Sequence, residues 1–140
     1  MTKFSWPVRI YWEDTDAGGI VFYANYLKFF ERARTEWLRS LGVVQHELRE
    51  RTGGMFVVSD TRTRHLAPAR LDDELRVTAE LVHTGQAVLE LRQQAFRGAD
   101  QTLLCEATIR IAWVLAHSLK PSRIPATLLQ RLAAAHTSKP

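Results

Sequence analysis

Two acidic residues, one position apart, precede a glycine pair near the start of the chain. Asp14 and Asp16 flank Thr15, and Gly18-Gly19 follows within three residues of Asp16. Acids and glycines are common in turns, so the composition of the segment by itself favours a structural loop. A carboxylate beside a carbonyl group could, however, attack its carbon or deprotonate a water molecule that attacks it. Two interpretations of the segment therefore remain open: a structural turn, or a site of acyl transfer.

A long amphipathic segment begins shortly after the glycine pair and favours the second reading. Between Ala24 and Leu41, apolar residues recur at spacings of three and four, and charged residues, Arg34 and Glu31 among them, fill the positions between. This pattern predicts one long helix with a broad apolar face. The first backbone N–H groups of a helix have no partner within it and lie at the positive end of its dipole, where an oxyanion is stabilised. The acids and the helix start together form a minimal acyl-transfer site.

The rest of the chain reads mainly as strands. From Phe4 to Glu13 the sequence alternates, with Val8, Ile10 and Trp12 on one face, which predicts a half-buried strand. Four further strands are expected between turn signals: the stretch 55–66, which is rich in Val, Thr and Phe, and the alternating runs 75–81, 89–95 and 103–113. A short helix is expected at 44–51, and a closing helix at about 125–135 with Pro125 as its first residue.

These elements predict a single α+β domain spanning residues 1–140, with its core at about 4–116. A five-stranded antiparallel sheet must cover one apolar face, and the long segment from Ala24 to Leu41 is the only substantial cover available. We therefore expect the sheet to wrap around one central helix. Phe30 and Trp37 should then be buried on that helix. The remaining sheet edges favour a homodimer or homotetramer.

Composition excludes several classes of function. The net charge of +4 is spread along the chain without a basic run, so no nucleic-acid partner is expected. Cys105 is the only cysteine, which rules out an internal disulfide or a multi-cysteine metal site, and no metal is expected. No apolar run approaches the roughly 18 residues of a membrane span. The cytoplasm is the expected location, and the tail from His136 to Pro140 is expected to be mobile.

A family resemblance rests on the same residues. The segment EDTDAGGIVFYANYLKFFERARTEWLRSLG, from Glu13 to Gly42, is similar to the signature of the hotdog-fold acyl-CoA thioesterases. It resembles both the 4-hydroxybenzoyl-CoA thioesterase family and, more closely, the Tol-Pal-associated acyl-CoA thioesterases of bacteria. The stretch from His65 to Leu75 resembles a second family element, and the likeness covers residues from about 8 to 115. The resemblance implies the hotdog fold and a thioesterase acting on short-chain or aromatic acyl-CoA.

The resemblance also implies roles for individual residues. Asp16 would be the catalytic carboxylate, as nucleophile or general base, and the backbone N–H of Tyr23 would polarise the thioester carbonyl. The supporting residues would be Asp14, Gly19, Asn25 and Tyr26. Many Tol-Pal-associated members carry His where this chain has Tyr23, whereas the hydroxybenzoyl enzymes carry Tyr, so the choice of substrate stays open. No cofactor is expected, since coenzyme A is part of the substrate.

Coenzyme A carries phosphates, so basic side chains are expected near the mouth of the site. The candidates are Arg64, Arg70, Lys120 and Arg123. His65 and Cys105 are assigned structural roles, in a strand and in the core. An alternative function is a non-catalytic or weakly catalytic protein of the same fold that binds acyl carrier protein or a membrane-associated complex. A dehydratase on this fold would want a histidine near the helix start, and none occurs between Met1 and Leu41.

Overall fold

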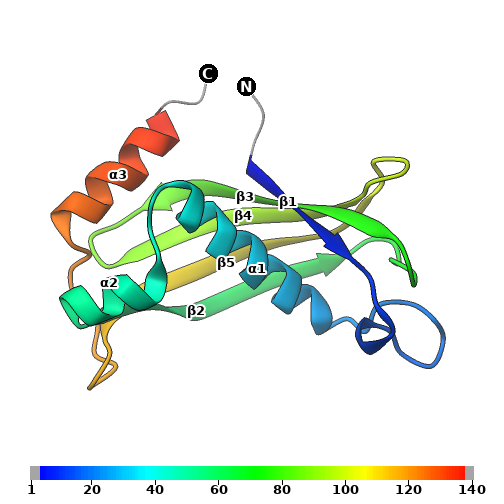
Figure 1. Ribbon diagram of the computed structural model, residues 1–140, viewed down its shortest axis with the longest axis horizontal. Coiled ribbons are helices and arrows are strands. Elements are labelled where there is room, and N and C mark those ends of the chain that lie inside the picture. The colour runs from blue at the N-terminus through cyan, green and yellow to red at the C-terminus, as the bar shows by residue number, and fades with distance from the viewer. Residues whose placement is uncertain (1–3, 138–140) are drawn as a thin grey trace.

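The computed structural model describes residues 4–137, and it shows one long helix lying across a five-stranded sheet (Figure 1). The long helix α1 spans Asn25–Ser40 and is followed by the short helix α2 at Gln45–Thr52. The strands are β1 at Phe4–Arg9, β2 at Gly54–His65, β3 at Glu74–Thr84, β4 at Val88–Arg97 and β5 at Leu103–Leu115. A one-turn 3₁₀ helix, η1, covers Trp12–Asp14, and helix α3 covers Ala126–Thr137.

The sheet has the order β1-β3-β4-β5-β2, and every neighbouring pair is antiparallel. The expected five-stranded antiparallel sheet with a central helix is therefore confirmed. Strands β1 and β2 form its two edges. In this order the end of β2 lies beside the beginning of β5, with His65 opposite Cys105. The loops that precede α1 reach this same end of the sheet, at the right of Figure 1.

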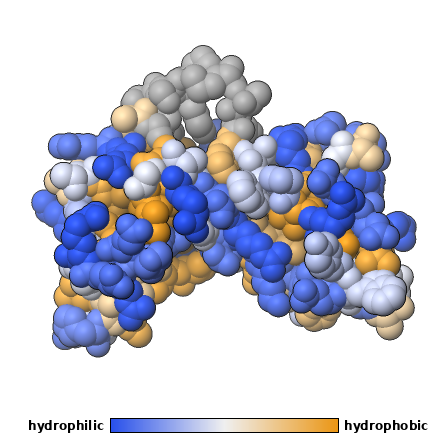
Figure 2. Space-filling model, in the orientation of Figure 1, coloured by the Kyte–Doolittle hydropathy of each residue, from blue (hydrophilic) through white to orange (hydrophobic). Residues whose placement is uncertain are grey.

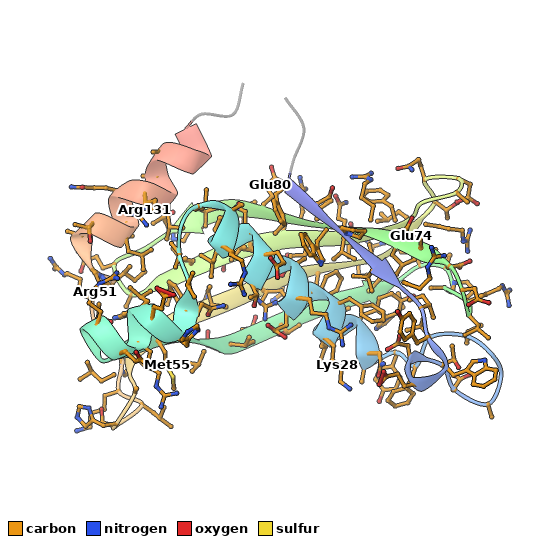
Figure 3. The ribbon with its side chains drawn as sticks, viewed as in Figure 1. Lys28, Arg51, Met55, Glu74, Glu80 and Arg131 are labelled. Carbon is orange, nitrogen blue, oxygen red and sulfur yellow. The ribbon has the colours of Figure 1, made fainter. Side chains whose placement is uncertain are left out.

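The core lies between α1 and the sheet face that it covers, and Figure 3 draws the side chains of both as sticks. Phe29, Phe30, Ala33 and Trp37 of the helix are buried, and they pack with inward-facing strand residues such as Leu91. The predicted burial of Phe30 and Trp37 is thus confirmed, and Glu31 is exposed as its position off the apolar stripe indicates. The face seen in Figure 2 is largely hydrophilic, with hydrophobic residues visible between the charged ones. No helix within residues 4–137 is long and apolar enough to cross a membrane.

The predicted first strand is too long. Strand β1 ends at Arg9, and the side chain of Trp12 is 79% exposed instead of facing the core with Val8 and Ile10. The Asp14 side chain explains the difference, because its Oδ2 accepts the backbone N–H of Tyr11 at 2.9 Å and closes the 3₁₀ turn. Such local bonds between an acidic side chain and the backbone compete with strand pairing.

Arg34 is a second correction, because it is buried rather than part of the solvated face of α1. Its exposed fraction is 8%, and its Nη1 donates to Oε1 of Gln93 at 3.0 Å. Nε2 of Gln93 donates to the carbonyl oxygens of Phe30 and Thr78 at 3.0 and 3.1 Å. Burial lowers the pKa of the Arg34 guanidinium. A polar group can be buried here because strand β4 supplies its partner.

The C-terminal helix begins one residue later than expected. Pro125 directly precedes α3, and its carbonyl oxygen accepts the N–H of Leu129 at 3.0 Å, so it occupies the cap position rather than the first helical position. Buried Leu128 and Leu132 attach α3 to the core. Of the tail expected to be mobile, residues 136 and 137 belong to this helix, and 138–140 lie outside the described residues.

Candidate active site

The loop before α1 folds back on itself and brings the acids beside the helix start. The N–H of Asp16 donates to the carbonyl of Ile20 at 2.9 Å, and the N–H of Phe22 donates to the carbonyl of Asp14 at 2.9 Å. Gly19 has a φ of +81°, which a residue with a side chain adopts only with strain. This turn places Asp16 opposite Ile20, Thr15 opposite Val21 and Asp14 opposite Phe22, the residue before Tyr23.

The two acids have opposite environments. Asp16 is exposed, and its Oδ1 accepts the N–H of Gly18 at 2.8 Å. Asp14 is 5% exposed, and both of its carboxylate oxygens accept hydrogen bonds from within the protein, from the Tyr11 N–H and from Nδ2 of Asn25. Asp14 and Asn25 therefore tie the loop to the start of α1. Asp16 is the carboxylate of the pair that a substrate can reach.

The start of α1 offers backbone donors. The N–H groups of Asn25 and Tyr26 bond to the carbonyls of Phe22 and Tyr23 at 2.9 and 3.4 Å. Within the described part of the chain, the N–H groups of Tyr23 and Ala24 have no hydrogen-bond acceptor. Two free N–H groups at a helix N-terminus can hold a developing oxyanion. The backbone position expected for Tyr23 is thus available for this role.

A pocket of about 290 Å³ opens beside these donors. Its walls come from the loop, the start of α1 and the segment that follows β2: Ile20, Val21, Tyr23, Tyr26, His65, Leu66, Ala67 and Pro68. Tyr26 is buried, and this burial raises the pKa of its hydroxyl to about 12. The ring of Tyr23 stands at the mouth and is 66% exposed. The pocket is therefore mostly apolar with few polar groups, as is common for sites of small ligands.

His65 belongs to this pocket, although sequence reasoning assigned it a structural role. The centroid of its ring lies 6.1 Å from that of Tyr23 and 5.5 Å from that of Tyr26. On its other side, Nδ1 lies 3.6 Å from the Sγ of Cys105. One signal could have revealed it, because His65 opens the second segment that resembles the thioesterases. Its contacts depend on the pairing of β2 with β5, which one sequence does not display.

The basic candidates for coenzyme A separate into two groups. Arg64 directly precedes His65 and forms an ion pair with Glu106 at 3.1 Å, and Arg70 bridges to Ile20 of the loop. Lys120 and Arg123 lie instead after β5, at the opposite end of the sheet from the pocket, where Arg123 contacts Gln86. Within one chain the structure does not bring these two to the site. The physical reason is the length of β5, since 13 residues carry the chain about 40 Å away.

Comparison with known proteins places this geometry in context. Residues 10–132 match the thioesterase-like superfamily. The chain is 43% identical over 122 residues to the acyl-CoA thioesterase YbgC of Haemophilus influenzae, covering 87% of this chain and 88% of that protein. A solved structure of a probable thioesterase from Bartonella henselae is 30% identical, with a TM-score of 0.81 over 89% of this chain and all of that one.

A more distant structure supports the fold. The Staphylococcus aureus protein SAV2348, solved in complex with CoA, has a TM-score of 0.90 at 20% identity, covering all of this chain and 89% of that chain. This similarity extends to the whole arrangement of helix and sheet. The chain thus has the architecture of the hotdog-fold thioesterases.

Proposed function

The chain belongs to the thioesterase-like superfamily, and from this premise we propose that it hydrolyses acyl-CoA to a free acid and coenzyme A. One observation carries the proposal. An exposed carboxylate, Asp16, lies in the loop that leads into α1, and at the start of that helix the backbone N–H groups of Tyr23 and Ala24 have no acceptor in the described chain. This combination supplies a group that attacks a carbonyl carbon and a group that stabilises its oxygen.

In the proposed reaction, the thioester oxygen accepts hydrogen bonds from the start of α1. Asp16 then acts in one of two ways: it deprotonates a water molecule that attacks the carbonyl carbon, or it attacks that carbon itself. Negative charge gathers on the carbonyl oxygen, where the N–H of Tyr23 lies at the positive end of the helix dipole. The C–S bond then breaks and coenzyme A leaves. Attack by water gives the free acid directly, whereas attack by Asp16 leaves an anhydride that a water molecule hydrolyses to the free acid. The reaction requires no cofactor and no metal.

The pocket suggests the size of the acyl group. Its volume of about 290 Å³ and its mostly apolar walls suit a short chain or one aromatic ring. The Haemophilus influenzae relative carries the name acyl-CoA thioesterase, which supports the acyl-CoA class and does not specify the acyl group. Arg64 and Arg70 are the residues we propose for the coenzyme A phosphates, and Lys120 and Arg123 would serve only from a neighbouring chain.

We further propose that the protein is cytoplasmic and forms a homodimer or homotetramer. Strand β2 is an edge of the sheet, and most of its residues are exposed or half-buried. An unpaired edge of 12 residues is a surface on which a second copy can continue the sheet. Light scattering at micromolar concentration tests this, because a stable monomer would contradict it. Acyl carrier protein and a Tol-Pal complex are further candidate partners.

A panel of acyl-CoA substrates tests the proposed reaction. Release of thiol is measured for aliphatic and aromatic acyl groups of increasing size, with the wild-type protein and with Asp16→Ala. We expect turnover of the smaller acyl groups by the wild type and its loss in the variant. No turnover of any acyl-CoA or acyl carrier protein substrate would overturn the enzyme reading and favour a binding protein. Full activity of Asp16→Ala would overturn the assignment of the carboxylate alone.

A further inference from the structure

His65 is the pocket residue to which the proposed reaction gives no task. The reaction changes the charge on two atoms of the thioester besides the carbon, namely the carbonyl oxygen and the sulfur. The backbone N–H groups at Tyr23 and Ala24 serve the oxygen, and Asp16 serves the carbon. The sulfur receives the electron pair of the broken C–S bond and still lacks a donor.

The surroundings of His65 determine what it can offer. Three elements pack around its ring: the loop with Tyr23, helix α1 with Tyr26, and strand β5 with Cys105. The neighbouring charges, Arg64 and Glu106, are paired with each other at 3.1 Å. No carboxylate contacts the His65 ring among the described residues. His65 is exposed, and its ring contacts two aromatic rings and the thiol.

The contact with Cys105 orients the ring. Burial raises the pKa of the Cys105 thiol to about 12, so the thiol is protonated near neutral pH. Its Sγ lies 3.6 Å from Nδ1 of His65, a contact in which the donor is set by the tautomer of the ring, and a protonated thiol can donate to an unprotonated Nδ1. In the neutral tautomer that accepts this hydrogen bond, the proton resides on Nε2, on the side of the ring away from Cys105. His65 thereby presents an N–H donor from the pocket wall.

We propose that His65 donates a hydrogen bond from Nε2 to the sulfur of the thioester as the thiolate departs. This inference rests on the proposed function and adds a residue to the same site. When Asp16 acts as general base, it takes a proton from water as the new C–O bond forms. The C–S bond then breaks, its electron pair stays on sulfur, and the proton on Asp16 passes to the thiolate. When Asp16 attacks directly, an anhydride forms on Asp16 as the C–S bond breaks; the thiolate then takes a proton from water, and the resulting hydroxide hydrolyses the anhydride to the free acid and restores Asp16. His65 keeps its own proton in both cases.

A comparison of leaving groups separates this role from a structural one. Three substrates share the butyryl group: butyryl-CoA, the N-acetylcysteamine thioester and the 4-nitrophenyl thioester. The first two release an alkyl thiolate, which gains from a hydrogen bond. The third releases an aryl thiolate whose charge spreads into the ring, so it gains little. A change in the shape of the pocket would affect all three in the same direction.

The expected result is a selective loss in His65→Phe. Its kcat/KM should fall about 10- to 100-fold on the two alkyl thioesters, as for loss of one donor to a developing charge, and less than about threefold on the aryl thioester. His65→Gln retains an N–H donor and should keep much of the alkyl thioester activity. His83→Phe, on the far part of β3, is the matched control and should behave as the wild type on all three.

Several outcomes would overturn the proposal. These are an equal loss on all three substrates in His65→Phe, no loss at all, or no recovery in His65→Gln. The proposal would also fail if Tyr23→Phe, and not His65→Phe, lost kcat/KM selectively on the alkyl thioesters. That result would assign the hydrogen bond to the Tyr23 hydroxyl. If the wild-type protein hydrolyses none of the three thioesters nor any other acyl-CoA, the proposed function fails, which is a different result from failure of His65 alone.

Discussion

The middle and the start of helix α1 treat their polar groups in opposite ways. In the middle, Arg34 and Gln93 are buried and bonded to each other, and Gln93 also binds two backbone carbonyls. At the start, the N–H groups of Tyr23 and Ala24 lack acceptors in the described chain, and Asp16 is exposed. The satisfied groups hold the helix on the sheet. The unsatisfied groups are available to a substrate, so the difference marks where chemistry can occur.

The largest effect on stability is expected in the middle of the helix. Trp37→Ala should reduce the free energy of unfolding by about 3–5 kcal/mol, because it leaves a cavity under α1. Denaturant unfolding measures the change. The folded fraction should keep its kcat for thiol release, since Trp37 is remote from the loop. A loss of kcat in fully folded protein would mean that the two parts of the helix are not independent.

Gln93→Leu tests the buried polar network and should cost about 2–3 kcal/mol, because it leaves Arg34 and two carbonyls without their partner. The matched double variant Arg34→Met with Gln93→Leu removes the charge as well. It should recover part of the lost free energy of unfolding, since an apolar pair of similar volume needs no partner. A double variant less stable than the sum of the single ones would contradict the idea that the network serves only to satisfy Arg34.

A smaller effect on stability, with a larger effect on activity, is expected at the helix start. Asn25→Ala removes the hydrogen bond from Nδ2 to Asp14 Oδ1 and should cost about 1 kcal/mol. Because this bond ties the loop to the first turn, kcat should fall more than it does in Trp37→Ala. Parallel measurements of unfolding and thiol release check this. Unchanged activity would show that the loop is positioned without Asn25.

Much of the fold could be predicted because its signals are strong and local. The helix from Asn25 to Ser40 follows from apolar residues at spacings of three and four, and strands β3 to β5 follow from alternation of apolar and polar residues. Strand β2 follows from a stretch rich in Val, Thr and Phe. The prediction that Trp12 faces the core was wrong because the alternation in the sequence continues past the end of the strand. There the hydrogen bond from the Tyr11 N–H to the Asp14 side chain determines the backbone conformation. The prediction that Arg34 lies on the solvated face of α1 was wrong because its hydrogen-bond partner, Gln93, lies 59 residues away in the sequence.

The site divides in the same way. The acid pair and the helix start could be proposed as a site from the sequence because the acids, the turn and the helix are contiguous, and the family resemblance then singled out Asp16 and the N–H of Tyr23. The placement of His65 depends on the register between β2 and β5 and on a contact across 40 residues with Cys105. Lys120 and Arg123 were grouped with the site by charge alone, and charge does not say at which end of a strand a residue lies. Residues whose positions depend on pairing between distant strands could therefore not be placed from the sequence, whereas the residues of the contiguous loop and helix start could.

The central claim is that Asp16 takes part in catalysis and contributes little to stability, whereas Asp14 stabilises the loop. Asp16→Asn tests it most directly when thiol release and unfolding are measured on the same sample. We predict that kcat/KM for the best acyl-CoA falls about 10²- to 10⁴-fold, while the free energy of unfolding changes by less than about 0.5 kcal/mol. Near wild-type activity in Asp16→Asn, or a loss of activity explained by unfolding, would contradict the account.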